Sequence, residues 1–183
     1  GKSLVMINHQ VKVTVLSVSL GSRPTRPGAL FQIKYVFPPD SKSFNTSSSP
    51  CVDGVVNLKS SAKHNVMLKP GVSVASEIQR GGGIGVELWR SANSRVRTER
   101  IRSGVVPGNV MRSLCTASST DNTSEVEIDL GGDVKAKMRI SYRSQEVTIE
   151  TTSKEGKVEE KTPQPTKSPS PIVPPKMEES STP

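Results

Sequence analysis

The feature that most constrains this chain is a strict alternation of apolar and polar residues in short runs separated by turn residues. Every second residue of the run 125–130 is apolar, and the run 134–142 repeats the pattern after Gly131-Gly132-Asp133. A period of two places alternate side chains on opposite faces of a strand. A Gly-Gly turn between two such runs predicts a β-hairpin. The chain is therefore expected to build an antiparallel sheet.

A second hairpin is predicted from Ile84 to Pro107, where a strand containing the only tryptophan, Trp89, precedes a basic loop and another apolar run. Few segments have a helical period: 72–80 is expected to form one or two helical turns and 108–114 a short one. Residues 41–50 are expected to be a polar loop. About eight strands are predicted, at 4–20, 29–37, 52–58, 64–68, 84–89, 101–106, 125–130 and 134–142. The fold class indicated is all-β, an antiparallel eight-stranded β-sandwich.

Composition divides the chain into a folded part, residues 1–150, and a tail, residues 151–183. Aromatic residues make up only 3% of the sequence, so the core must come from Val, Ile, Leu and Met, which suit a sheet. The tail is dominated by Pro, Ser, Thr, Lys and Glu. Because it has almost nothing to bury, it cannot offset its ordering entropy and is expected to be disordered. No stretch approaches the roughly 20 apolar residues that span a bilayer.

The net charge of +8 lies in the folded part, where 20 Lys and Arg face 12 Asp and Glu, while the tail is balanced at five of each. Such a surface suits acidic partners, namely proteins, anionic membranes or nucleic acid. A merely solubilising surface is the alternative.

Two basic groups are candidates for the binding surface. Planar guanidinium groups suit bidentate recognition of carboxylate or phosphate, and a dense run of them surrounds the second hairpin. A further group alternates along one face of the last strand. The candidates are Arg90, Arg95, Arg97, Arg100 and Arg102 in the first group and Lys135, Lys137 and Arg139 in the second. Both could instead be charged, solvated strand faces.

Catalytic and metal-binding signatures are missing from the sequence. His9 and His64 have no Ser, Cys or acid at a triad-like spacing, which argues against nucleophilic catalysis. Cys51 and Cys115 lie far apart, without the paired spacing of a zinc site, and are expected to be reduced. The chain is predicted to be no enzyme and to carry no cofactor or metal.

The tail contains one peptide-ligand motif. Pro171, Pro174 and Lys176 match P-x-x-P followed by a basic residue, the spacing with which a polyproline II helix docks into SH3-type aromatic grooves. An inert linker is the alternative.

The order of these parts resembles a C2 domain over residues 4–143. The resemblance rests on LFQIKYVFPPDS, GIGVELWRS, RIRSGVVPGNVMRSL and EIDLGGDVKAKMRISY, and the long loops are similar to those of divergent C2 domains in centriolar and ciliary scaffold proteins. Calcium-binding members use several aspartates on facing loops. Here the first loop offers Asp40 and the second only Ser91, Asn93 and Ser94, so the resemblance implies a calcium-independent domain.

Together these observations predict a non-catalytic binding module of a larger scaffold or adaptor, engaging acidic protein partners or anionic membrane through a basic surface. The expected location is cytoplasmic, with cytoskeletal, centriolar or peripheral-membrane association as narrower options. The alternative is a nucleic-acid-binding or viral coat-like β-sandwich, although few aromatic residues are available for base stacking.

Overall fold

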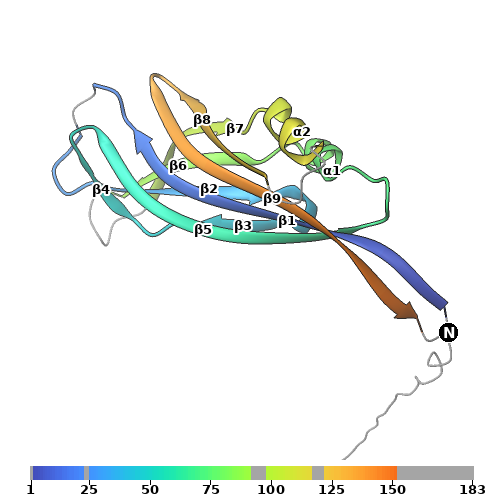
Figure 1. Ribbon diagram of the computed structural model, residues 1–183. Helices are drawn as coiled ribbons and strands as arrows, with labels where there is room; N and C mark the ends of the chain where they lie inside the picture. Colours follow the sequence, from blue (N-terminus) through green and yellow to red (C-terminus); the bar gives the residue numbers. More distant parts are fainter. Residues whose placement is uncertain (1, 23–24, 92–97, 117–121, 152–183) are drawn as a thin grey trace, which may run out of the picture. The chain divides into compact units, whose positions relative to one another are not determined.

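The computed structural model describes residues 2–22, 25–91, 98–116 and 122–151, and they divide into two compact units. Residues 5–147 form the larger unit, and the smaller one contains residues 2–4 and 148–151. The strands are β1 (Lys2–Ser19), β2 (Leu30–Phe37), β3 (Lys42–Asn45), β4 (Ser49–Val52), β5 (Val55–Leu68), β6 (Gly85–Ser91), β7 (Thr98–Val105), β8 (Asn122–Gly131) and β9 (Val134–Thr151). The helical segments are η1 (Pro38–Asp40), α1 (Val74–Arg80) and α2 (Gly108–Thr116) (Figure 1).

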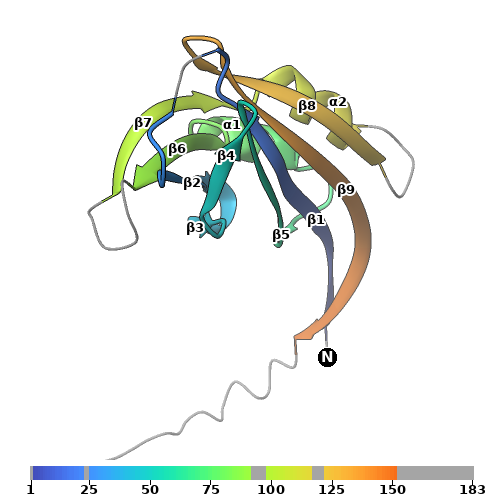
Figure 2. The ribbon, with the colours of Figure 1, turned by 90° about the vertical axis from the view of Figure 1, so that its left-hand side faces the viewer.

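The larger unit is a curled antiparallel sheet in the order β7-β6-β2-β4-β5-β1-β9-β8, with β3 paired to β2 outside this path. It forms two layers, one of β5, β1, β9 and β8 and one of β3, β2, β6 and β7 (Figure 2). The short strand β4 joins the layers because it pairs with both β2 and β5. The predicted all-β, antiparallel architecture is confirmed, with nine strands in the described ranges.

The core lies between the two layers and follows the alternation of the sequence. Val11, Val13 and Val15 of β1 are fully buried, while Lys12 between them is exposed. The hairpin of β8 and β9 turns at Gly131, Gly132 and Asp133, all with positive φ. Both hairpins predicted from the alternation are therefore present.

Two details of the strand assignment were wrong. The expected polar loop 41–50 contains β3 and the first two residues of β4, short strands that the polar sequence did not indicate. The two strands expected at 52–58 and 64–68 are one continuous strand, β5. Its polar middle stays in the sheet because its backbone pairs with β1, and the Ser61 hydroxyl lies 2.8 Å from the Thr14 hydroxyl.

The tail expected to be disordered, residues 151–183, lies beyond the described ranges apart from Thr151, with which β9 ends. Pro171, Pro174 and Lys176 therefore lie outside the described residues, as do Arg95 and Arg97 of the first basic group.

Candidate basic cleft

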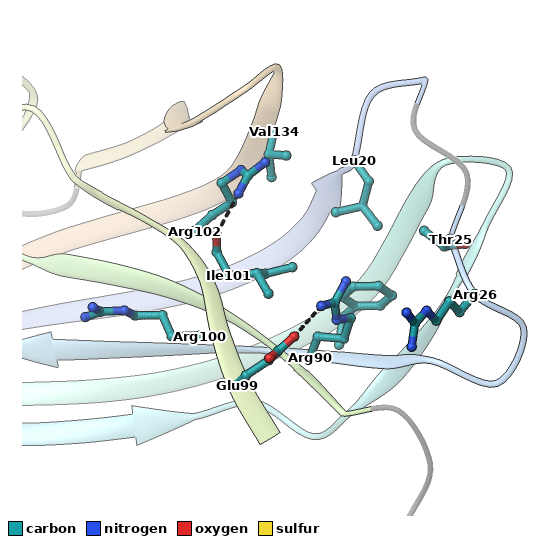
Figure 3. A pocket seen from close by; sticks show the side chains of 10 residues that line it. Leu20, Thr25, Arg26, Arg90, Glu99, Arg100, Ile101, Arg102 and Val134 are labelled. Atoms are coloured by element: carbon teal, nitrogen blue, oxygen red, sulfur yellow. Dashed lines mark hydrogen bonds and ion pairs between the residues drawn. The ribbon is translucent and has the colours of Figure 1, made fainter. Parts of the chain in front are cut away.

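A cleft of about 400 Å³ opens at one end of the larger unit, where the loop after β1, the β6–β7 pair and the start of β9 meet (Figure 3). Its floor is apolar and its rim is basic. The lining residues are Leu20, Thr25, Arg26, Phe31, Arg90, Glu99, Arg100, Ile101, Arg102 and Val134. Four arginines and a single carboxylate thus surround the opening, and we call it the basic cleft.

A β-bulge in the β6–β7 ladder brings part of the rim into place. Leu88 pairs with Arg102, but the next residue of β6, Trp89, pairs with Arg100, so Ile101 is the extra residue. An extra residue shifts the alternation and turns the following side chain to the other face. Arg102 consequently shares the side of buried Leu88, facing the cleft, whereas Arg100 shares the outer side of Trp89.

The arginines of the cleft differ in their partners. Arg90 forms an ion pair with Glu99, and the Nη1 atom of Arg102 donates to the Ile101 carbonyl oxygen at 2.8 Å (Figure 3). Neither Arg26 nor Arg102 has an ion pair with a carboxylate in the described part of the chain. These two guanidinium groups are therefore the least neutralised cations of the rim.

Arg100 lies at the edge of the cleft, but its guanidinium group belongs to a polar cluster on the outer face. Its Nη1 atom lies 3.0 Å from Oε2 of Glu87, whose Oε1 accepts a 3.0 Å hydrogen bond from the indole of Trp89. Burial disfavours the charge on Glu87, but these hydrogen bonds and the nearby cations outweigh it and lower the pKa of that carboxyl group. The Nζ atom of Lys34 lies 4.0 Å from the centre of the Trp89 ring, a cation–π contact.

The second predicted basic group does not join the cleft. Lys135, Lys137 and Arg139 are exposed on β9, and the register places each opposite a carboxylate of β8: Asp129, Glu127 and Glu125 in turn. Arg139 reaches Glu125 at 2.9 Å. The outer face of this hairpin is therefore charge-balanced, and among the described residues of the two groups Arg90, Arg100 and Arg102 line the cleft.

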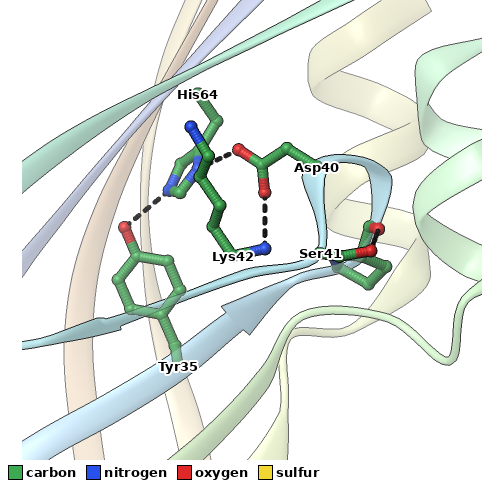
Figure 4. Close-up of polar contacts among 6 residues, drawn as sticks. Tyr35, Asp40, Ser41, Lys42 and His64 are labelled. Carbon is green, nitrogen blue, oxygen red and sulfur yellow. Dashed lines mark hydrogen bonds and ion pairs between the residues drawn. The ribbon is translucent and has the colours of Figure 1, made fainter. Parts of the chain in front are cut away.

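Sequence reasoning missed Arg26, a cleft residue carried by the loop after β1. It also missed a buried polar chain of three residues, because these are spread over the sequence (Figure 4). His64 does not stand alone: its Nδ1 atom lies 2.9 Å from Asp40 Oδ2, and its Nε2 atom lies 2.8 Å from the Tyr35 hydroxyl. A carboxylate can only accept, so Nδ1 donates to Asp40, and the tautomer that carries this proton leaves Nε2 to accept from the Tyr35 hydroxyl.

This polar chain links β2, η1 and β5 inside the unit. Tyr35 is 1% exposed and His64 is 4% exposed, and the His64 ring stacks on Phe37 with ring centres 4.3 Å apart. Burial, followed by the charge of Asp40, raises the pKa of Tyr35. The triad-like order of groups thus has an enclosed hydroxyl at its end, and the three side chains connect the two layers.

Three further structural facts bear on the sequence expectations. Cys51 and Cys115 are free, and burial raises the pKa of the Cys115 thiol to about 12. No group of three or more His, Cys, Asp or Glu in the described ranges is arranged to hold a metal ion. Among the helices of those ranges, none is long and apolar enough to cross a membrane.

No protein-family model matches this chain, and no curated protein matches it either. Several solved structures are similar in fold. A C2 domain of a plant extended synaptotagmin 1 is 15% identical with a TM-score of 0.47, covering 73% of this chain and 93% of that domain. A structure of CC2D1B is 11% identical with a TM-score of 0.47, covering 72% of this chain. Human GIVD cytosolic phospholipase A2 is 10% identical with a TM-score of 0.44, covering 79% of this chain.

The chain spans about half (53%) of the CC2D1B structure and 17% of the phospholipase. These likenesses concern the fold alone, which is C2-like.

Proposed function

We propose that this chain is a non-catalytic, calcium-independent binding module of a larger scaffold or adaptor, and that it holds an acidic protein segment in the basic cleft. The observation that carries this proposal is the composition of the cleft: of its four lining arginines, Arg26 and Arg102 have no carboxylate partner among the described residues, and they stand beside an apolar floor. Guanidinium groups recognise carboxylates through paired hydrogen bonds. The floor would take an apolar side chain of the same segment.

The contacts of Asp40 support calcium independence. One of its carboxylate oxygens is held by His64 and the other accepts from the backbone N–H of Lys42 at 3.0 Å. A hard cation needs six to eight oxygen ligands, and this carboxylate is already engaged and only 16% exposed.

The surroundings of the aromatic residues favour a protein partner over nucleic acid. The chain has six aromatic residues, all of them described. Phe31, Phe37, Tyr35 and Tyr142 are buried, and Phe44 is half-buried against the ring of Tyr35. Trp89 has Lys34 over its ring. Recognition of single strands relies on exposed aromatic faces for base stacking, and few are offered here.

The test compares two arginine variants of the full chain that each remove one charge. Arg102→Gln alters the cleft, whereas Arg80→Gln alters an exposed residue of α1 that is paired to Glu77. The probe is a labelled peptide in which glutamate alternates with leucine, measured by fluorescence anisotropy at physiological salt. We expect Arg102→Gln to weaken binding roughly tenfold, since a hydrogen bond to a charged group contributes about 1.5 kcal/mol. Arg80→Gln should leave it unchanged.

Two other probes distinguish the partner classes. Equal binding of the peptide to both variants would refute the cleft as the site. Tighter binding to vesicles containing phosphatidylserine than to the peptide, with the same loss in Arg102→Gln, would make an anionic membrane the partner. Binding to single-stranded RNA with a steep dependence on salt would favour the nucleic-acid alternative.

A further inference from the structure

Strand β5 has one edge that is largely unpaired. On one side it pairs with β1 along its length, from Val55 opposite Ser19 to Leu68 opposite Ile7. On the other side, β4 covers only Val55 and Val56. From Asn57 to Leu68, the described residues provide no strand on this second side, so β5 is the margin of the layer that runs from β8 through β9 and β1 (Figure 2).

The unpaired edge is regular along its second half. Lys59 has a positive φ of 49°, and the register with β1 shifts between Val15 and Ser17, so the strand is irregular near this lysine. Pairing is continuous from Ser60 opposite Val15 to Leu68 opposite Ile7. Such an edge presents unpaired backbone N–H and C=O groups and can accept another strand. We call this segment, Ser60–Leu68, the β5 edge.

The charges beside the β5 edge are unbalanced. Lys63 lies directly opposite Lys12 of β1, and both side chains are exposed on the outer face. Like charges directly opposite each other destabilise an antiparallel pair. No carboxylate of the described residues forms an ion pair with either lysine. Arg143 adds another cation, since it lines with both lysines a hollow of about 260 Å³.

A second copy of this chain, paired through the same edge, would bring no negative charge to it, because residues 57–68 contain no Asp or Glu. Symmetric antiparallel pairing about Lys63 would place the two copies of this lysine opposite each other, and pairing about Ser61 would place each Lys63 opposite a Lys59. Either arrangement adds like charges to a face that already contains the Lys12–Lys63 pair. The β5 edge lacks negative charge. Charge complementarity therefore favours an acidic strand from another protein as its partner.

We propose that the β5 edge binds an extended acidic segment of another protein as an additional strand. A carboxylate of that segment lies opposite Lys63, at the usual cross-strand separation of about 5 Å between Cβ atoms. Met67, which is 42% exposed, lies on the same face because side chains alternate along a strand. The partner is thus expected to carry an acidic residue opposite Lys63 and an apolar residue four positions away, opposite Met67. This surface is separate from the basic cleft.

The test uses the full chain and a synthetic peptide that has a glutamate and, four positions later, a valine, with a matched peptide of the same sequence in which every second backbone amide is methylated. Methylation keeps the charge but removes the donors that strand pairing needs. We expect the first peptide to slow amide exchange in residues 60–68 and the methylated peptide to have no such effect. Equal binding of the two peptides would overturn strand addition in favour of simple charge attraction.

Lys63→Glu is the decisive variant, and Lys137→Glu is its control, because Lys137 lies on the same layer opposite Glu127 and away from the edge. Lys63→Glu should weaken peptide binding at least tenfold and should fold well, since it creates a favourable pair with Lys12. Lys137→Glu should retain binding. If binding survives Lys63→Glu but is lost in Arg102→Gln, the peptide occupies the basic cleft, which overturns this proposal while supporting the proposed function.

Discussion

Replacing Gly104 with alanine tests how closely strands β7 and β8 approach each other. A Cβ atom at Gly104 would lie 2.5 Å from the carbonyl oxygen of Asp129 and 3.1 Å from Cδ2 of Leu130. Ordinary contacts begin near 3.4 Å, so β7 and β8 would have to separate by about 0.9 Å. The nearest atom, the carbonyl oxygen of Asp129, belongs to the backbone, so no side-chain rotation can relieve the contact. Overpacking of this kind costs about 1–3 kcal/mol, and we expect a loss of about 2 kcal/mol in the free energy of unfolding.

Gly85 on the neighbouring strand β6 provides the matched control. A Cβ atom there would meet nothing within 4 Å, and neither glycine has a positive φ. Gly85→Ala should therefore be neutral or stabilise by up to about 1 kcal/mol, because alanine restricts the unfolded chain more than glycine does.

The assay is urea-induced unfolding of both variants and the parent chain, followed by Trp89 fluorescence. In a parallel thermal-unfolding experiment, the same loss of about 2 kcal/mol would lower the melting temperature by roughly 4–8 °C for a chain of this size. If Gly104→Ala is as stable as Gly85→Ala, β7 and β8 do not approach each other as described, and the account of how the layers close is refuted.

Two further predictions concern the buried histidines. Tyr35→Phe removes the hydroxyl that donates to His64 and leaves a buried acceptor unsatisfied, so thermal unfolding should show a loss of about 1–2 kcal/mol; an unchanged stability would contradict the structural role of the polar chain. Burial lowers the pKa of His9, whose Nε2 atom is buried and has no hydrogen-bond partner among the described residues. The unfolded state therefore takes up a proton near pH 6.5 that the folded state excludes, and stability should fall as the pH decreases below 6.5. His9→Phe should flatten this part of the profile, and an identical profile for both proteins would show that another group is responsible.

The alternation of the sequence was sufficient to predict the two long hairpins and the all-β class, since burial follows the period of two in β1, β6, β8 and β9. It was not sufficient for β5, whose middle has lysines and serines where a half-buried strand would have apolar residues. There the pairing with β1 keeps the segment in the sheet, and this pairing is invisible in the local pattern.

The lining of the basic cleft was predicted in part, and its role in binding stays a prediction. Arg90, Arg100 and Arg102 were found from their density in the sequence, whereas Arg26 comes from a loop whose position depends on the fold. The pairing of Lys135 with Asp129 could have been worked out in advance, because the Gly131-Gly132-Asp133 turn sets the register of the hairpin. The meeting of His64 with Asp40 could not, since 24 positions of sequence and a change of layer separate them.

The charge balance of the β8–β9 hairpin has a kinetic consequence. At about 0.1 M salt, charges are screened over roughly 10 Å, and oppositely charged neighbours cancel within that range. An approaching acidic molecule would therefore be attracted more by Lys12, Lys63 and the rim of the basic cleft than by this hairpin. Its encounter rate should decrease steeply as salt is added, while its residence time, which depends on contacts already formed, should change little. The charge-balanced hairpin thus influences where a partner first binds, although the hairpin itself does not contact the partner.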